Sequence, residues 1–379
     1  MSDEIRFRAL ILSAVKHDYI AKAVQDHRRF EIVGVADETE QPEWVDARNE
    51  EFALQAGVAY YKGITEAITA ARPDVAIVTS QTERHCDLAI QALSAGLHVI
   101  VDKPLSNSLQ ECERLVQCLA NRPELKCLVW NRNCFPSIQH AMQQVQEGEI
   151  GELQSVHCDF YFAKDAGPRL GSRTAADGPI DWLERQIEAH VDGSDGAVGN
   201  VPMGELQNEG LYPLAFIHRF TGGRCVERVF ARATTHFHQA HADNKVDDLA
   251  SVTLEMQGGV LGSICLGRIG AAGHPNLGEI KVHLVGSTGA LVIQESAPEV
   301  SLYYRGQPKE EYPDIRVYNE NDYLLLENFV TAIEDGGELI LDAKAAAEIA
   351  RVTDACLRSA SDHRVVELES TTQVQRDEQ

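Results

Sequence analysis

The chain has 379 residues, and its 34 Lys and Arg against 58 Asp and Glu give a formal net charge of −24. This length predicts two domains. The negative charge opposes binding to nucleic acid or to anionic membranes. The sequence shows neither a signal-peptide pattern nor a run of about eighteen apolar residues, so we expect no membrane span. Nine scattered cysteines without a C-x-x-C spacing are typical of reduced thiols, which predicts a cytoplasmic protein.

The first 130 residues alternate strand-like and helix-like segments. Apolar residues at helical spacing, for example Leu88, Ala92 and Leu93, precede Gly96, where we expect a helix to end in left-handed geometry. This alternation predicts an α/β fold, with a Rossmann-type doubly wound parallel sheet in a dinucleotide-binding domain over residues 1–130. We predict strands at residues 7–12, 31–37, 74–80, 98–101 and 126–130.

Lys103 follows the fourth of these strands. The segment LHVIVDKPL, residues 97–105, is an apolar strand that stops at an acid, a lysine and a proline. Ligands of open α/β sheets bind at the carboxyl ends of the strands, so Lys103 is a candidate for chemistry. A solvated loop lysine is the alternative interpretation.

The second half of the sequence is richer in strands. Long alternating segments, such as QSVHCDFYFA at 154–163, predict a C-terminal α+β domain over residues 131–379 with a large, mostly antiparallel sheet. Residues 164–207 have little periodicity, and a loop of this length is a candidate lid. Asp342 is the predicted N-cap of a long helix over residues 342–361, and the short strand VVEL follows that helix.

Several ordered motifs carry a family resemblance. Residues 74–106 closely resemble the nucleotide-domain core of the glucose-fructose oxidoreductase and inositol dehydrogenase family (Gfo/Idh/MocA), with Asp102 in place of the family's glutamate. VQEGEIGELQSVH at 145–157, GEIKVHLVGSTGALVI at 278–293 and HRVVEL at 363–368 are similar to later family segments, so the resemblance covers essentially the whole chain. It implies a Rossmann domain followed by a substrate-binding and oligomerisation domain.

The resemblance also implies a chemistry and a set of cofactor contacts. Members are NAD(P)-dependent oxidoreductases, and their second-domain sheet commonly forms the contact of a homodimer or homotetramer. The implied cofactor-binding residues are Ser80, Thr82, His85, Asp102 and Lys103. For His85, a helix-capping role is the alternative.

A second catalytic segment is implied at residues 208–215, NEGLYPLA, where the family has Asp-x-Gly-x-His-x-x-Asp. A branch of the family that handles sugars and diols carries Gly-x-Tyr, so Tyr212 takes the acid/base role by resemblance. An ammonium from Lys103 beside the phenol would lower its pKa toward neutrality, and Tyr212 could then exchange a proton with a substrate hydroxyl. Asn208 can orient a hydroxyl but cannot ionise. A tyrosine with a structural hydrogen bond in a buried helix is the alternative.

The loop after the first strand lacks the expected glycines. A dinucleotide fold normally shows G-x-G-x-x-G here, but this chain has SAVKHD at 13–18, with Ser13, Val15 and His17 as candidate cofactor contacts. Asp18 would compete with a phosphate at the helix N-terminus, so we expect weak dinucleotide affinity unless Lys16 or His17 turns toward the phosphates.

Asp37 ends the second strand, where a carboxylate would hold the ribose hydroxyls of NAD. Glu38 follows it, and the neighbouring sequence offers no cation for a 2′-phosphate. We therefore predict NAD as the cofactor, NADP as less favoured, and strong discrimination between the two. Ordinary turn chemistry at a strand end is the alternative for Asp37.

Other polar residues have weaker patterns. Arg132, by resemblance, and Arg169 with Arg173 are candidate substrate contacts. His236, His238 and His241, with Asp243 nearby, form the spacing H-x-H-x-x-H. This spacing suits a metal, but the family resemblance implies none, and we expect no metal site. His218 is expected to be an ordinary helix residue.

The sequence therefore predicts an NAD-dependent oxidoreductase that acts on a secondary alcohol or ketone of a sugar, cyclitol or related polyol. Lys103 and Tyr212 would supply the polar catalysis, and Asn208 the positioning. A family-fold protein that has lost catalysis and acts as a sugar or dinucleotide sensor is the alternative, because the glycine loop is missing and Asn208 and Ala215 stand where the family has acids.

Overall fold

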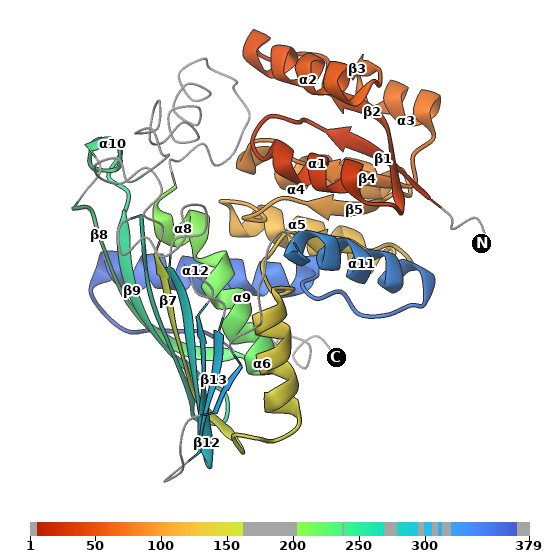
Figure 1. Cartoon of the computed structure of the whole chain (residues 1–379). Coiled ribbons are helices and arrows are strands. Elements are labelled where there is room, and N and C mark those ends of the chain that lie inside the picture. The colour runs from red at the N-terminus through yellow and green to blue at the C-terminus, as the bar shows by residue number, and fades with distance from the viewer. Residues whose placement is uncertain are drawn as a thin grey trace, which may run out of the picture. The chain divides into compact units, whose positions relative to one another are not determined.

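The computed structural model describes residues 6–161, 203–236, 239–268, 279–294, 299–304, 310–312 and 320–369. These residues form two compact units, which are coloured along the chain in Figure 1. Among the described residues, no helix is long and apolar enough to cross a membrane.

The N-terminal unit contains a six-stranded parallel sheet with the order β3-β2-β1-β4-β5-β6. β1 pairs with β2 on one side and with β4 on the other, so the strand order reverses between β1 and β4. The predicted parallel sheet is confirmed, although β3 was not predicted. The strands are β1 Phe7–Leu12, β2 Phe30–Asp37, β3 Tyr60–Lys62, β4 Val75–Val78, β5 His98–Val101 and β6 Cys127–Val129.

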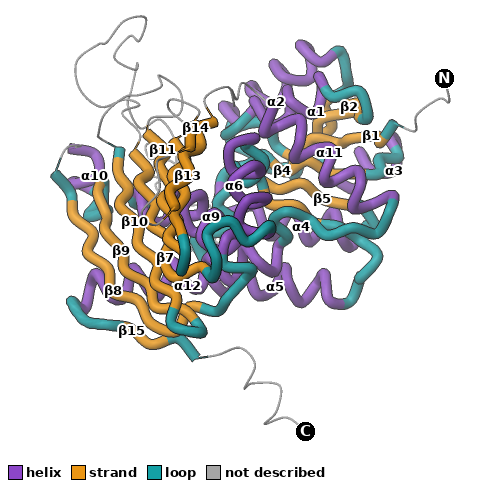
Figure 2. Tube along the Cα trace, turned by 60° about the horizontal axis from the view of Figure 1, so that its bottom comes forward, coloured by secondary structure: helices purple, strands orange, loops and turns teal. Residues whose placement is uncertain are grey.

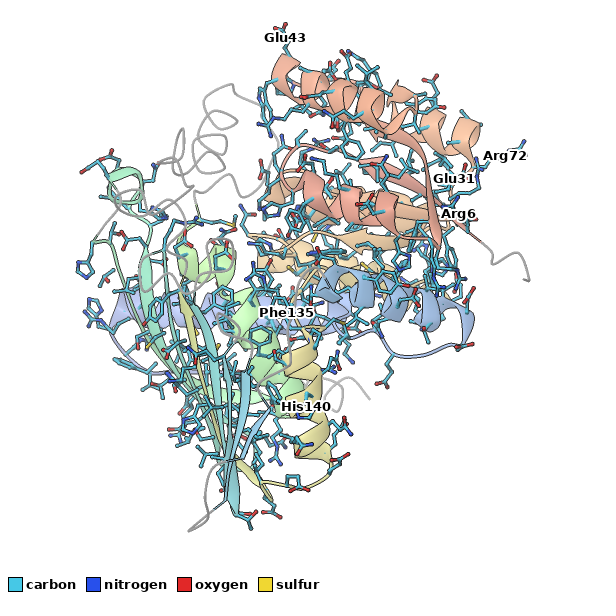
Figure 3. All side chains as sticks on the ribbon, in the orientation of Figure 1. Arg6, Glu31, Glu43, Arg72, Phe135 and His140 are labelled. Atoms are coloured by element: carbon cyan, nitrogen blue, oxygen red, sulfur yellow. The ribbon has the colours of Figure 1, made fainter. Side chains whose placement is uncertain are left out.

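The two ends of this sheet differ in the residues they carry. Figure 3 shows Arg6, Glu31 and Arg72 together at the end where β1 and β2 begin. The opposite, carboxyl end carries the candidate ligand site, because a reversal of strand order opens a crevice there.

Helices of the N-terminal unit pack on this sheet. α4 buries Leu88, Ala89, Ala92 and Leu93, and Gly96 after it has φ 84°, as its position at the end of the helix predicted. The helices are α1 Asp18–Asp26, α2 Glu43–Ala56, α3 Ile64–Ala71, η1 Thr82–Arg84, α4 His85–Ser94, α5 Leu109–Ala120 and α11 Glu320–Glu334.

A late segment of the chain returns to the N-terminal unit. Residues 320–350 cluster with residues 6–132. Phe329 of α11 stacks on Phe30 with ring centroids 6.5 Å apart, and Leu128 of β6 forms a β-bridge with Asp342. A single boundary near residue 131 omits this return, because the apolar residues of α11 do not indicate in sequence which sheet they cover.

The C-terminal unit is built on a nine-stranded sheet with the order β14-β13-β12-β11-β7-β10-β9-β8-β15, shown as orange tubes in Figure 2. Among the described strands of this sheet, only β10 and β7 pair in parallel, so the predicted large, mostly antiparallel sheet is confirmed. The strands are β7 Leu153–Tyr161, β8 Val226–Thr234, β9 Leu249–Met256, β10 Val260–Gly267, β11 Glu279–Gly286, β12 Gly289–Gln294, β13 Glu299–Tyr304, β14 Glu310–Tyr312 and β15 Val366–Glu367.

Helices α6, α8 and α9 pack on this sheet. The N-cap of α12 is confirmed, because the Ala345 amide donates to Asp342 Oδ1 at 2.7 Å. The helices are α6 Pro136–Gln146, α8 Glu205–Glu209, α9 Leu211–Phe220, α10 Gln239–Asp243 and α12 Ala343–Asp362, of which α12 begins in the N-terminal unit.

Candidate active site

Lys103 lies directly after β5, at the carboxyl end of the parallel sheet. Its residue is only 2% exposed, and the Asp102 before it is fully buried. The Lys103 amide donates to Asp102 Oδ1 at 2.6 Å, and the Lys103–Pro104 peptide is cis. This burial rules out the solvated loop lysine and leaves a cation held at the sheet end where ligands bind.

Asp102 is held in its ionised form. His17 Nδ1 lies 2.7 Å from Asp102 Oδ2. Burial by itself would raise the pKa of Asp102, but His17, Lys16 and His85 outweigh it and hold the pKa well below its ordinary value. Lys16 Nζ donates to Thr82 Oγ1 at 2.6 Å. The side chains of Lys16 and His17 therefore both contact protein groups, so the structure does not show the turn toward a phosphate that would offset the expected weak dinucleotide affinity.

The loop after β1 takes a glycine-like conformation without glycine. Ser13 has φ 63°, in the left-handed region that glycine adopts most easily. Ala14 N donates to Asn49 Oδ1 at 2.7 Å, Val15 N to Ser13 O at 3.0 Å, and Lys16 N to Thr79 O at 3.1 Å. These amides are already used within the protein, so a phosphate has to rely on other donors.

A cavity of about 310 Å³ lies against this loop. Three cationic and two acidic side chains line it, and this small excess of positive charge favours an anionic group such as a pyrophosphate. Arg48 also donates to Val15 O at 2.7 Å and braces the loop from α2. The lining residues are Ala14, Val15, Lys16, Asp18, Lys22, Arg48, Glu51, Phe52 and Gln55.

Asp37 ends β2 and is fully buried. Its Oδ2 accepts from Asn49 Nδ2 at 2.9 Å, and its Oδ1 accepts from the Glu38 amide at 2.8 Å and from Arg84 Nη2. Arg84 also pairs with Glu38 at 3.0 Å. The prediction that no cation lies near Asp37 is therefore wrong, because η1 brings Arg84 there from 47 residues further along the chain.

His85 joins the loops that follow β4 and β5. Its Nδ1 lies 2.8 Å from Pro104 O, and its Nε2 lies 3.0 Å from Ser80 O. Burial lowers the pKa of His85 to about 4, so the imidazole is neutral at pH 7 and donates to one carbonyl at a time. His85 makes no side-chain cap on α4, and its contacts fix the turn that carries Lys103.

In the C-terminal unit, Tyr212 lies in the first turn of α9 and is 2% exposed. Its ring stacks on Phe160 of β7 with centroids 5.4 Å apart. Asn208, in α8, donates from Nδ2 to Glu209 Oε1 at 2.9 Å. Gly210 joins the two helices, and a Cβ at this position would lie 2.1 Å from Leu206 O, so only glycine fits. The tight join holds Asn208 and Tyr212 in adjacent helical segments.

A buried charged cluster lies beside α8, and sequence analysis missed it. Glu205 Oε1 accepts from Arg268 Nε at 2.7 Å and lies 3.2 Å from His241 Nε2. Asp247 Oδ2 accepts from the Leu206 amide at 2.8 Å. Burial, with a further contribution from Glu205, raises the pKa of Asp247 to about 6. Three separate segments of the chain supply these charges, namely the start of α8, residues 241–247 and the residue after β10, so no local motif marks the cluster.

The remaining candidates are dispersed. The His236 amide donates to the Asp248 carboxylate, and His241 contacts Glu205, while His238 lies outside the described residues. Arg132 is half-buried and follows β6. Burial raises the pKa of Asp322, and the nearby Arg132 opposes part of that rise. Arg169, Arg173 and nearly all of the candidate lid also lie outside the described residues.

A parallel sheet with a reversal of strand order and buried charges at its carboxyl edge is typical of dinucleotide-binding proteins. Residues 12–129 match the family model GFO_IDH_MocA, an oxidoreductase family with an NAD-binding Rossmann fold. Residues 204–368 match the model of that family's C-terminal alpha/beta domain. The chain therefore belongs to the Gfo/Idh/MocA family of oxidoreductases, and its cofactor is NAD.

Individual relatives are similar to this chain in sequence, and solved structures are similar to it in fold. The chain is 24% identical over 270 residues to trans-1,2-dihydrobenzene-1,2-diol dehydrogenase of Mus musculus, covering 71% of this chain and 69% of that protein. It is 25% identical to inositol 2-dehydrogenase of Rhizobium meliloti, covering 79% and 82%. An inositol dehydrogenase homolog from Azotobacter vinelandii, solved with NADH and myo-inositol, has the same fold, with a TM-score of 0.74, 19% identity and coverage of 96% and 98%.

Proposed function

We propose that this oxidoreductase transfers hydride between NAD and a secondary alcohol or ketone of a sugar, cyclitol or related polyol. The observation that carries the proposal is Lys103, a buried cation at the carboxyl end of β5 in an NAD-binding Rossmann sheet. The names of two relatives, an inositol dehydrogenase and a dihydrodiol dehydrogenase, support an alcohol carried on a ring.

Residues of the N-terminal unit would hold the dinucleotide. The left-handed Ser13, the cationic cavity beside Val15 and the buried Asp37 suit a phosphate loop and a ribose subsite. His17, Thr82 and Asp102 would shape the pocket, with Ser80 and His85 fixing its wall. NAD supplies the hydride acceptor when it is bound.

Three side chains would handle the substrate hydroxyl. Tyr212 takes up its proton as the alcohol is oxidised and returns it in the reverse direction. The Lys103 ammonium favours the ionised phenol and polarises the reacting oxygen. Asn208 has no proton to accept and orients a hydroxyl through its amide. Arg132 and Arg169 are the proposed further contacts to the substrate.

The nine-stranded sheet is the proposed contact of a homodimer or homotetramer. Strand register places Phe230 of β8, Leu261 of β10 and Val285 of β11 on one face, and all three are exposed. Exposed apolar residues on three strands of the same face support the proposal that this face is an interaction surface. All nine cysteines lie within the described residues and none of them forms a disulfide, which supports a reducing, cytoplasmic location.

A panel of polyols, cyclitols and sugars, read by the absorbance of reduced nicotinamide, tests the proposal. We expect turnover with at least one ring alcohol, and loss of about 10²-fold or more in Lys103→Met. Lys62 offers a matched control, because it ends β3 of the same sheet but is half exposed, where it pairs with Asp46. Lys62→Met should keep wild-type turnover. Binding of dinucleotide and polyol without turnover across the panel would instead support the sensor.

A further inference from the structure

Arg84 spans the carboxyl edge of the N-terminal sheet. It is the last residue of η1, and its Nη1 lies 3.4 Å from Ser13 Oγ and 3.2 Å from Gln81 Oε1. Its Nη2 donates to Asp37 Oδ1 and to Glu38 Oε2. One guanidinium therefore bridges the ends of β1 and β2, the two strands whose loops would hold a dinucleotide.

The Asp37 carboxylate has little room for another donor. Oδ1 already accepts from Arg84 and from the Glu38 amide, and Oδ2 accepts from Asn49. The Asp37 side chain is 0% exposed, whereas the Arg84 side chain that covers it is 16% exposed. Ribose hydroxyls can reach both carboxylate oxygens only if the guanidinium withdraws from Oδ1.

Glu38 gives the displaced guanidinium a second position. Its side chain is 46% exposed and already pairs with Arg84 at 3.0 Å. Arg84 can therefore leave Asp37 and stay ion-paired at the rim of the subsite. A guanidinium at that rim is the cation that a 2′-phosphate requires, because its fork geometry matches phosphate oxygens.

We propose that Arg84 sets the selectivity of this chain at the 2′ position of the dinucleotide. Arg84 covers Asp37 and weakens NAD binding, and it pairs with a 2′-phosphate and strengthens NADP binding. The chain therefore prefers NAD only weakly, in contrast to the strong discrimination predicted from Asp37 and Glu38. This inference rests on the proposed use of the Asp37 subsite for the adenosine ribose.

Calorimetric titration of the full chain with NAD and with NADP, without substrate, tests the inference. For the wild type we expect the two dissociation constants to lie within about tenfold, the factor equivalent to one charge-assisted hydrogen bond. In Arg84→Met the carboxylate is uncovered and the cation is lost. NAD should then bind about threefold to tenfold more tightly, and NADP about tenfold more weakly.

Arg48→Met is the matched control, because Arg48 braces the same loop through Val15 O. It should change both affinities in the same direction. Arg84→Lys keeps a charge but loses the fork, so its ratio should lie between those of the wild type and Arg84→Met. Melting midpoints of all variants establish that they are folded.

Opposite shifts of NAD and NADP in Arg84→Met support the inference. Equal shifts of both cofactors in that variant overturn it and leave the proposed function intact. A wild-type preference for NAD of more than about a hundredfold also overturns it, whether or not the variants fold. If neither dinucleotide binds the wild type, both the inference and the proposed function fail.

Discussion

Each unit of the molecule buries an aspartate beside its candidate site, and the pKa values of the two shift in opposite directions. Asp102 follows β5 in the N-terminal unit, and its pKa lies well below the ordinary value. Asp247 precedes β9 in the C-terminal unit, and its pKa rises to about 6. Both side chains are almost fully shielded from solvent.

Neighbouring charges explain the difference. Burial raises the pKa of both carboxyls. Around Asp102, the interactions with His17 and with the Lys16 ammonium reverse that effect, whereas Asp247 faces the carboxylate of Glu205, which adds to it. The strand-end carboxylate is therefore fixed as an anion that holds the loops around Lys103, while the one beside α8 can change its protonation state near neutral pH.

The largest effect on stability is expected for Glu205→Gln. Glu205 is fully buried against Arg268 and His241, so the substitution removes the carboxylate that lies nearest the buried guanidinium, while Glu209 lies farther from it, at 3.8 Å. We expect a loss of about 3–5 kcal/mol in the free energy of unfolding, measured with urea. Asp18→Asn is the control, because Asp18 is half exposed and pairs only with Lys22 on the same helix among the described contacts. It should change stability by less than about 1 kcal/mol, and an equal loss in both variants would contradict the account of the cluster.

Asp102→Asn should cost less, about 2 kcal/mol, because its partner His17 stays partly exposed and can be hydrated. The matched control is Asp102→Glu, which keeps the charge and introduces the residue that the family resemblance places there. Urea denaturation of both variants measures the difference. If the Glu variant is destabilised as much as the Asn variant, charge is not what Asp102 contributes.

Titration of Asp247 should change the free energy of unfolding by an amount on the order of 2 kcal/mol. Its folded pKa of about 6 exceeds its ordinary value of 3.8, so the folded state binds more protons between those values. Stability contributed by this group therefore falls as pH rises through about 4 to 6. Asp102 acts in the opposite direction, losing its contribution as pH falls below its ordinary pKa.

Asp247→Asn should remove the decline in stability that we assign to Asp247 between about pH 4 and 6. Unfolding measured at several pH values between 4 and 7 for wild type and variant isolates this contribution, because all other groups titrate in both. Identical pH profiles for the two proteins would show that Asp247 does not titrate as described.

Sequence predicted the features that depend on local pattern. The ends of apolar strands placed Asp37, Asp102 and Lys103 at one sheet edge, since parallel strands bring their carboxyl ends together. The N-cap at Asp342 and the left-handed Gly96 were also confirmed, because each depends on residues within one turn.

Long-range contacts could not be predicted in this way. The local sequence around Arg84 does not indicate a partner for its side chain. The pairing of Arg84 with Asp37 depends on how two loops pack. Glu205, Arg268 and His241 come from three separate elements. The signal for such a pair is the burial of an acid or a cation. Burial is known only from the fold, so the sequence could not supply this signal.

The proposed function has Lys103 and Tyr212 act together on the substrate hydroxyl. The most direct test is a double-mutant cycle on kcat with a ring alcohol that the enzyme oxidises, using Lys103→Met, Tyr212→Phe and the double variant. We expect each single substitution to lower kcat by about 10²–10⁴-fold, and the double variant to lose little more than the worse single one, because residues that act as a unit are not additive. Losses that multiply in the double variant, or wild-type turnover in Lys103→Met, would contradict the claim.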